Sequence, residues 1–302
     1  MSTPQPPLQH SEFDHRMAVF GSDDEWIAAA LPFLEEGLAA PQEPPPTVIA
    51  APAKLDLLRD ALGADAKAMT FIPHTDWYAG SAANAVSQSA GYLAAHAGPG
   101  GRIHLLMEPD WSGRAGRSAR ETAEWIRYES LANLLFAPFR TTALCAYDTR
   151  TAGSAIVDAA RRAHPDTPVY EAPARLVGEL DALPLPPPPP GADLLETPDP
   201  EAVRAWAVAR GLAPAEAGLF AAAVAEAAPG PLADGALLWG DAPACVCELR
   251  TAARVDDPLA GFVPPATAEL EPGQGLWFTR QVCAYVDIRD RGEGSAIRIQ
   301  YA

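Results

Sequence analysis

Polar and aromatic side chains stand at the carboxyl ends of three strand-like segments in the first half of the chain. His74 follows one segment, Glu108 and Trp111 follow the next, and Tyr147 and Asp148 end a third. In an open α/β sheet, ligands bind in the crevice outside the carboxyl ends of the strands. Aromatic walls with a few polar groups suit a small organic molecule, so these five residues are predicted to line a ligand-binding site.

The same side chains also allow a structural interpretation. Glu108 and Asp148 would then pair with nearby arginines such as Arg114 or Arg150, and Trp111 would pack in the core. Two carboxylates beside an aromatic ring are also compatible with hydrolytic chemistry. No paired nucleophile or base accompanies them, so no catalytic residue is assigned here.

Two histidines complete the set of candidate side chains in this half. His15 is included among the candidate ligand-binding residues, but for His15 and His164 alike the favoured interpretation is a hydrogen-bonded packing histidine. The cysteines form no CxxC pair and have no accompanying histidine spacing, so no metal site is predicted and the thiols are expected to be reduced and buried. They are Cys145, Cys245, Cys247 and Cys283.

Strand-like and helix-like segments alternate from residue 15 to residue 163, which favours a mostly parallel sheet covered on both faces. Strands are predicted at 15–20, 47–51, 68–72, 102–107 and 142–147, and helices at 23–38, 54–62, 82–96, 118–136 and 152–163. The loop at residues 20–25 holds three acidic side chains where a phosphate-binding loop would need glycines and a lysine. This α/β domain is therefore expected to lack a working P-loop.

Five consecutive prolines, 186–190, mark the clearest boundary, because proline cannot donate a backbone hydrogen bond and favours a stiff extended spacer. We expect a first domain at 10–182, a proline-rich linker at 183–198 and a second domain at 199–302. In the second domain, helices are predicted at 199–210, 214–228 and 276–285, and strands at 236–239, 245–250, 286–289 and 296–301. This order describes an α+β two-layer sandwich.

The composition excludes several classes of protein. A net charge of −17 argues against a nucleic-acid surface, which relies on basic patches. No apolar run approaches the ~20 residues that a membrane-spanning helix needs, and residues 1–9 lack the basic start and apolar core of a signal peptide. A cytoplasmic location is expected.

An ordered series of short motifs in residues 10–182 resembles the MEDS sensory domain. The motifs lie at 15–16, 20–25, 32–38, 58–63, 108–114, 128–133, 145–148 and 164–165. The resemblance implies a RecA-like α/β fold that has lost phosphate binding and acts as a sensor, with small organic molecules as the suspected ligands.

Residues 199–302 resemble the small serine-kinase domain of anti-sigma factors, within the GHKL ATPase group, through fragments at 257–261, 273–277, 280–283 and 296–298. The resemblance implies a helix that carries a glutamate able to act as a base and, four residues later, an asparagine that binds magnesium. Glu226 is present at the first position, but Gly230 stands at the second, and prolines on both sides of it would break the helix. The metal site implied by the family is therefore disrupted.

The adenine-binding positions of that family also differ. Thr251 stands in place of the aspartate that receives the adenine amino group, and Ala253 stands in place of a glycine. Gly273 and Gly275 remain as a remnant of the nucleotide loop. We expect neither kinase nor ATPase activity, no metal and no cofactor, with weak ATP binding left open.

The leading hypothesis is a non-catalytic signalling regulator. Its first domain would sense a small molecule, and its second would bind a sigma factor or a STAS-type antagonist, as the resemblance implies. A homodimer is compatible with the resemblance. The alternatives are an active ATP-dependent serine kinase and a scaffold protein that binds no ligand.

Overall fold

The computed structural model of the 302-residue chain describes residues 12–40, 42–78, 81–96, 101–109, 111, 119–227, 232–263 and 275–301. It divides the chain into two compact units. The first unit comprises Met1–Ala79 and Gln88–Leu176, and the second comprises Gly80–Ser87 and Val177–Ala302. None of the helices among the described residues combines the length and apolar composition that crossing a bilayer requires.

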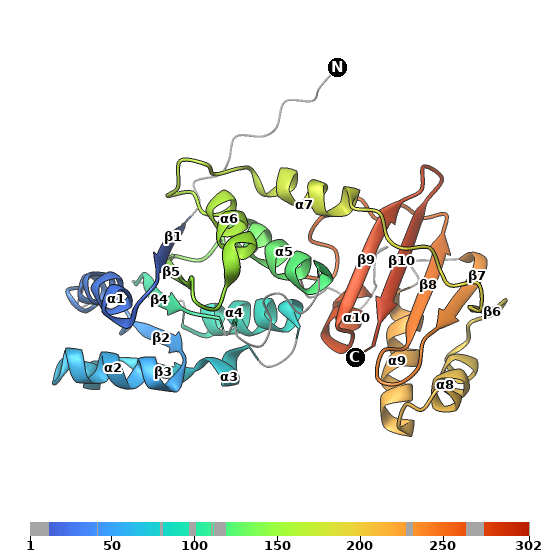
Figure 1. Cartoon of the computed structure of the whole chain (residues 1–302), viewed down its shortest axis with the longest axis horizontal. Helices are drawn as coiled ribbons and strands as arrows, with labels where there is room; N and C mark the ends of the chain where they lie inside the picture. The colour runs from blue at the N-terminus through green and yellow to red at the C-terminus, as the bar shows by residue number, and fades with distance from the viewer. Residues whose placement is uncertain are drawn as a thin grey trace, which may run out of the picture. The chain divides into compact units, whose positions relative to one another are not determined.

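A five-stranded, wholly parallel sheet forms the centre of the first unit (Figure 1). Its strands are β1 (Phe13–Phe20), β2 (Thr47–Ala50), β3 (Thr70–Pro73), β4 (Ile103–Met107) and β5 (Thr141–Asp148), in the order β1-β5-β4-β2-β3. Every residue of β2, β4 and β5 is buried. Strands buried on both faces are typical of parallel sheets covered by helices on each side.

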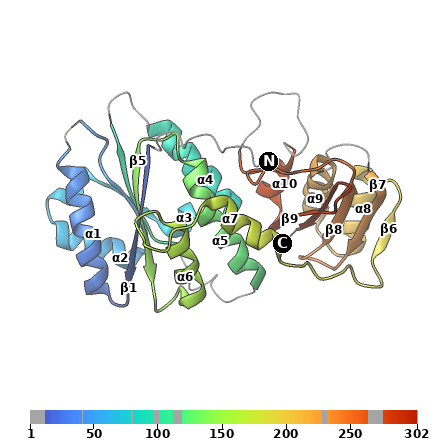
Figure 2. The ribbon, with the colours of Figure 1, turned by 90° about the horizontal axis from the view of Figure 1, so that it is seen from above.

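The helices of this unit cover both faces of the sheet (Figure 2). They are α1 (Asp23–Leu38), α2 (Pro52–Leu62), α3 (His74–Trp77), the part of α4 (Ala82–His96) that begins at Gln88, α5 (Ala119–Leu135) and α6 (Gly153–Ala163), with a 3-10 turn at Asp65–Ala68. The side chains of α1 and α2, including Trp26, Leu34 and Leu58, pack on β2, β4 and β5. Leu93 of α4 and Ala132 of α5 pack on the other face.

The strand order creates a topological switch point between β2 and β4. The chain leaves β2 through α2 toward β3 on one side, and it leaves β4 through α5 toward β5 on the other side. The two connections diverge at the carboxyl ends of β2 and β4, where α/β sheets commonly bind ligands.

The loop between β1 and α1 is a helix cap. The hydroxyl of Ser22 accepts a hydrogen bond from the backbone N–H of Glu25 (3.2 Å), and the carboxylate of Glu25 accepts one from the N–H of Gly21 (2.6 Å). Acidic side chains in the first turn also favour the helix dipole. The carboxylate of Glu25 therefore accepts the hydrogen bond of a backbone N–H, that of Gly21, which a phosphate bound here would need.

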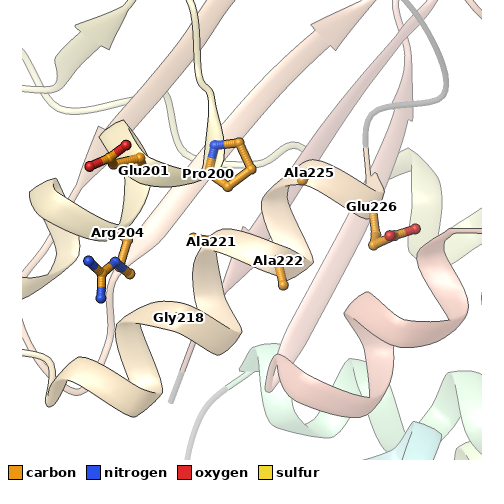
Figure 3. A pocket seen from close by; sticks show the side chains of 8 residues that line it. All are labelled: Pro200, Glu201, Arg204, Gly218, Ala221, Ala222, Ala225 and Glu226. Atoms are coloured by element: carbon orange, nitrogen blue, oxygen red, sulfur yellow. The ribbon is translucent and has the colours of Figure 1, made fainter.

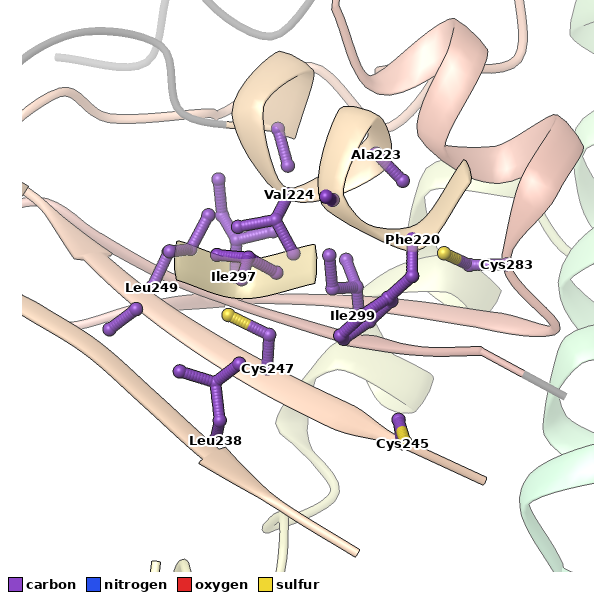
Figure 4. Packing of buried hydrophobic residues seen from close by; sticks show 14 of the residues in the cluster. Phe220, Ala223, Val224, Leu238, Cys245, Cys247, Leu249, Cys283, Ile297 and Ile299 are labelled. Atoms are coloured by element: carbon purple, nitrogen blue, oxygen red, sulfur yellow. The ribbon is translucent and has the colours of Figure 1, made fainter. Parts of the chain in front are cut away.

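The second unit contains a five-stranded antiparallel sheet with three helices packed on one face. Its strands are β6 (Asp193–Leu195), β7 (Leu232–Trp239), β8 (Val246–Thr251), β9 (Tyr285–Asp290) and β10 (Ser295–Gln300), in the order β6-β7-β8-β10-β9. The helices are α8 (Pro200–Ala209), α9 (Pro214–Ala227) and α10 (Leu276–Val282), and α7 (Pro173–Ala182) precedes the prolines. Figure 4 shows Phe220 and Val224 of α9 facing Leu249, Ile297 and Ile299 of the sheet.

Several elements differ from the sequence predictions. The segment 183–198, predicted to be a linker, contains β6, which pairs with β7 at the sheet edge. The prolines cannot donate hydrogen bonds, but they still accept them, and the guanidinium of Arg298 donates to the carbonyl of Pro186 (2.7 Å). The helix predicted at 276–285 ends at Val282, because the N–H of Ala284 donates to the carbonyl of Gln300 in the sheet (3.0 Å). Helix α7 was not predicted.

Candidate functional site

A buried charge cluster lies at the carboxyl ends of the parallel strands. Lys54, in the first turn of α2, donates hydrogen bonds to the carboxylates of Glu108, after β4, and Asp148, at the end of β5 (3.0 Å to Oδ2). Its ammonium group also lies 4.5 Å from the centre of the Phe20 ring and 5.7 Å from that of Trp26. We call Lys54, Glu108 and Asp148 the strand-end cluster. It lies at the topological switch point.

Arg150 completes the charge balance of this cluster from the outside. Its guanidinium donates to both carboxylate oxygens of Asp148, at 2.8 Å to Oδ1 and 2.6 Å to Oδ2, and to Asp23 at 2.7 Å. Burial alone would raise the pKa of Asp148, but the hydrogen bonds from Arg150 and Lys54 outweigh it and hold that pKa well below its usual range. Asp148 is therefore a carboxylate. The predicted alternative pairing of Asp148 with Arg150 is present, whereas Arg114 lies outside the described residues.

Glu108 differs from Asp148 because it is buried with less compensation. Its side chain is 6% exposed, and its Oε2 atom has no hydrogen-bond partner among the described residues. Burial raises the pKa of Glu108 to about 7, although the positive charge of Lys54 opposes the shift. This carboxyl group consequently exchanges its proton near neutral pH, a property that clusters at functional sites.

The aromatic residues predicted for this site are buried rather than open to a crevice. The ring of Trp111 is stacked on that of Tyr147, with centroids 5.9 Å apart, and meets Trp125 edge-on. Trp111 is 1% exposed and Tyr147 is fully buried, which agrees with the alternative interpretation of Trp111 as a packing residue. The indole N–H of Trp111 nevertheless has no hydrogen-bond partner among the described residues.

The structure separates the six predicted ligand residues into four groups, one of which is the stacked pair of Trp111 and Tyr147. Glu108 and Asp148 meet at Lys54, whereas His74 opens α3 after the edge strand β3. His15 lies within β1, on the face covered by α5 and α6, where its ring packs against His164 with centroids 3.9 Å apart. Sequence reasoning missed Lys54, although it is one of only two lysines in the chain and directly follows a predicted strand.

His15 and His164 belong to a second buried group, together with Glu129 of α5 and Cys145 of β5. Each of these side chains offers one metal-ligating atom, and the four atoms lie within 4.8 Å of one another. All four residues are buried. We call them the buried His–Cys–Glu cluster.

The positions of the second unit that were compared with the GHKL motifs make mainly structural contacts. The hydroxyl of Thr251 accepts a hydrogen bond from the N–H of Ala253 (3.0 Å) and so closes a local turn. A Cβ atom on Gly275 would lie 2.1 Å from the carbonyl oxygen of Glu226, so this glycine permits the close approach of α10 to α9. Gly230 and Gly273 lie outside the described residues.

Glu226 is exposed near the end of α9, where it borders a shallow groove between α8 and α9 (Figure 3). The groove has a volume of about 510 Å³. Its lining is dominated by alanine and glycine, with charged side chains at its margins: Pro200, Glu201, Arg204, Gly218, Ala221, Ala222, Ala225 and Glu226. Among the described residues that line the groove, the polar side chains, Glu201, Arg204 and Glu226, are all exposed, so none is a buried group that would orient a nucleotide.

The fold and the strand-end cluster together define an α/β domain with a polar site at its switch point and a first loop whose backbone N–H is bonded to Glu25. The profile of the MEDS family, described as the MEthanogen/methylotroph, DcmR Sensory domain, matches residues 14–165. This match spans half of the chain and covers all five strands of the parallel sheet. The chain therefore belongs to the MEDS family, and the description indicates a role in signalling. No curated protein and no solved structure shows a significant match.

Proposed function

We propose that this chain is a non-catalytic signalling regulator whose first unit senses a small organic molecule at the strand-end cluster. The observation that carries the proposal is the burial of Lys54, Glu108 and Asp148 together at the switch point of the sheet. Buried ion pairs contribute little net stability compared with apolar packing. A ligand-binding role gives this costly arrangement a use.

The chemistry of the cluster suggests how a ligand would bind. Lys54 supplies a cation that is already held by two carboxylates, and Oε2 of Glu108 accepts no hydrogen bond within the described part of the chain. A small molecule with a hydroxyl, carbonyl or amine group would compete for these groups. Binding would change the protonation of Glu108, whose pKa of about 7 makes it responsive. The switch-point location and the sensory description of the family support this assignment.

For the first unit we propose a RecA-like fold that has lost phosphate binding. Its sheet is parallel, and in the loop after β1 the backbone N–H of Gly21 donates to the carboxylate of Glu25 instead of to a phosphate. For the second unit we propose a GHKL-like frame that binds a sigma factor or a STAS-type antagonist. The hydroxyl of Thr251 is committed to a turn, and Gly275 is packed against Glu226. These contacts support a protein-binding role without phosphoryl transfer.

Ligand-observed NMR with a library of small polar organic molecules tests the sensory assignment on the full chain. Molecules that bind the wild type are expected to bind Glu108→Gln at least tenfold more weakly, because the exchangeable carboxyl group is lost. Glu36→Gln is the matched control. Glu36 lies on α1, is half-exposed, and pairs with Arg16 of β1 and not with the strand-end cluster. Equal affinity for all three proteins would refute the strand-end cluster as the binding site.

Two further measurements test the role of the second unit. Calorimetric titration with Mg-ATP is expected to show no magnesium-dependent binding, and micromolar binding would favour the active-kinase alternative. Affinity purification from the native cell, followed by mass spectrometry, is expected to recover a sigma factor or a STAS protein. Recovery of neither, together with a negative ligand screen, would favour the scaffold alternative.

A further inference from the structure

Four side chains with metal-ligating atoms converge inside the first unit, away from the strand-end cluster. His15 comes from β1, Cys145 from the neighbouring strand β5, Glu129 from α5 and His164 from the residue after α6. Their ligating atoms lie within 4.8 Å of one another, and the most exposed of the four residues, Cys145, is only 8% exposed. Such a concentration of ionisable groups in a core requires an explanation.

The hydrogen bonds of His15 fix its tautomer. Asn133 donates its side-chain amide to the carbonyl of Ala163 (2.6 Å), so its oxygen faces Nδ1 of His15 (3.1 Å). Nδ1 of His15 must therefore carry the proton that it donates. The lone pair of Nε2 is then directed into the cluster, where Sγ of Cys145 lies 3.3 Å away.

His164 is oriented in the same way. Its Nδ1–H donates to the carbonyl of Ala160 (2.7 Å), which leaves the lone pair on Nε2. That atom is fully buried, lies 4.0 Å from Oε2 of Glu129, and neither atom has a hydrogen-bond partner among the described residues. Metal-binding histidines characteristically donate their other ring N–H to a carbonyl or carboxylate oxygen. Both histidines here show that arrangement.

Burial shifts the pKa of each of the four side chains toward its neutral form. Burial, together with the neighbouring His164, lowers the pKa of His15, and burial lowers that of His164 to about 4, so both rings are neutral. Burial raises the pKa of Glu129 to about 7, against the opposing effect of the Tyr147 hydroxyl, and raises that of the Cys145 thiol. Neutral imidazole is the form that binds metal, and a nearby cation would stabilise both anions.

We propose that the buried His–Cys–Glu cluster binds one divalent transition-metal ion of the zinc type. The ligands are Nε2 of His15, Nε2 of His164, Sγ of Cys145 and a carboxylate oxygen of Glu129. This site is distinct from the proposed small-molecule site. Binding breaks the S–H bond of Cys145 without any change of oxidation state: the sulfur keeps its electron pair and shares it with the metal, and the proton leaves to solvent. Any proton on Glu129 is released in the same way.

The geometry and the donor set are consistent with tetrahedral zinc. Two nitrogens, one sulfur and one oxygen form a borderline-soft set that suits zinc better than magnesium or calcium. With ordinary bond lengths the ligand atoms of such a site lie roughly 3.5 Å apart, so the widest separation must shorten by about 1 Å. A cavity of about 20 Å³, lined in part by His15, Glu129 and Cys145, lies beside the cluster.

The sequence prediction of no metal site used the spacing of cysteines and histidines along the chain. Successive ligands of this cluster are 114, 16 and 19 residues apart along the chain, and they come from separate elements. Only the pairing of β1 with β5 brings His15 beside Cys145. Spacing rules for short zinc motifs do not detect sites of this kind.

The experiment measures metal directly in the full chain. Wild-type protein produced in zinc-supplemented medium is expected to contain about one zinc per chain by elemental mass spectrometry. Cys145→Ala is expected to contain at least tenfold less. Cys283→Ala is the matched control, because Cys283 is also a buried thiol, 2% exposed, but lies in the core of the second unit.

A spectroscopic test identifies the ligands. The chain is unfolded in chelator and refolded with Co²⁺, which is expected to give the visible bands of a tetrahedral site and a thiolate-to-cobalt charge-transfer band. Cys145→Ser is expected to lose the charge-transfer band, and Asn133→Ala to weaken Co²⁺ binding about 10–100-fold, because it releases the ring of His15. Circular dichroism verifies that each variant is folded.

Two results would overturn the proposal. One is a folded wild-type protein that contains less than about 0.1 equivalent of metal and gives no cobalt charge-transfer band. The other is a folded Cys145→Ser variant that retains this band, which would place the thiolate ligand elsewhere. The cluster would then be a network of neutral hydrogen-bonded side chains.

Discussion

The raised pKa of Glu108 makes a quantitative prediction about stability. The pKa is about 7 in the folded chain, compared with 4.5 for an unperturbed glutamate. The folded state therefore binds this proton more tightly than the unfolded state does. Below pH 4.5 Glu108 is protonated in both states, so its ionisation does not oppose folding. As the pH rises from 4.5 to about 7, the folded state progressively loses stability relative to the unfolded state. The full difference corresponds to about 3 kcal/mol.

Glu108→Gln removes this ionisation while keeping nearly the same shape. The free energy of unfolding of the variant, relative to wild type, is expected to rise by about 3 kcal/mol between pH 4.5 and about pH 8. Other titrating groups are common to both proteins, so their contributions cancel in the difference unless they interact with Glu108. The main interacting groups are Lys54 and Asp148.

The assay must follow the first unit by itself. Urea unfolding measured by pulsed hydrogen exchange and mass spectrometry reports peptides from β4 and β5 separately from those of the second unit. Carbon-13 NMR of the glutamate carboxyl groups gives the pKa of Glu108 directly. The argument from burial would be refuted if the free energy of unfolding changed equally with pH in wild type and Glu108→Gln, and if the carboxyl group of Glu108 titrated near 4.5.

The control is Glu36→Gln. Hydrogen bonds from Arg16 lower the pKa of Glu36, so its contribution has the opposite sign: it is present at neutral pH and is lost as the pH falls. Its side chain is 48% exposed, and exposed pairs contribute less than about 1 kcal/mol. The two variants should therefore diverge from wild type in opposite directions.

The remaining predictions concern buried charges and close backbone contacts, and the same unfolding assay checks each of them. Lys54→Met should destabilise the first unit by about 3–5 kcal/mol at about pH 8, and by less at about pH 5, because protonation relieves one of the two carboxylates; an equal loss at both values would contradict this. Gly275→Ala should cost the second unit about 1–3 kcal/mol because of the 2.1 Å contact that its Cβ would make. Gly218→Ala, in the same unit with no atom within 4 Å of its Cβ, should instead stabilise α9 by about 0.5–1 kcal/mol. Arg298→Met should cost about 3 kcal/mol, because it leaves Glu248 buried with only the weaker pairing to Arg250.

Much of the secondary structure follows from local patterns. Continuous apolar runs predict β2, β4 and β5, and Ser22 with three following acids predicts the start of α1. The short strand β6 could not be predicted, because three residues beside a proline run carry no periodic pattern. Its formation depends on the exposed edge of β7, which lies more than 35 residues away in the chain.

The same distinction applies to the positions of the predicted site residues. Glu108 and Asp148 follow strands that pair with a common sheet, so their meeting could be anticipated from the rule for carboxyl ends. The burial of Trp111 and Tyr147 could not, because it depends on Trp125 of α5 packing edge-on against Trp111, which in turn stacks on Tyr147. The separation of His15 from this group depends on which face of β1 its side chain takes.

The sequence by itself determined the alternation of strands and helices and the positions of the strand ends, because these depend on residues within one turn or one strand of each other. Tertiary structure alone decided the lateral order of the strands. That order places Lys54 between two carboxylates and brings His15 of β1 beside Cys145 of β5. Strand order depends on packing between distant segments, and no local pattern encodes it.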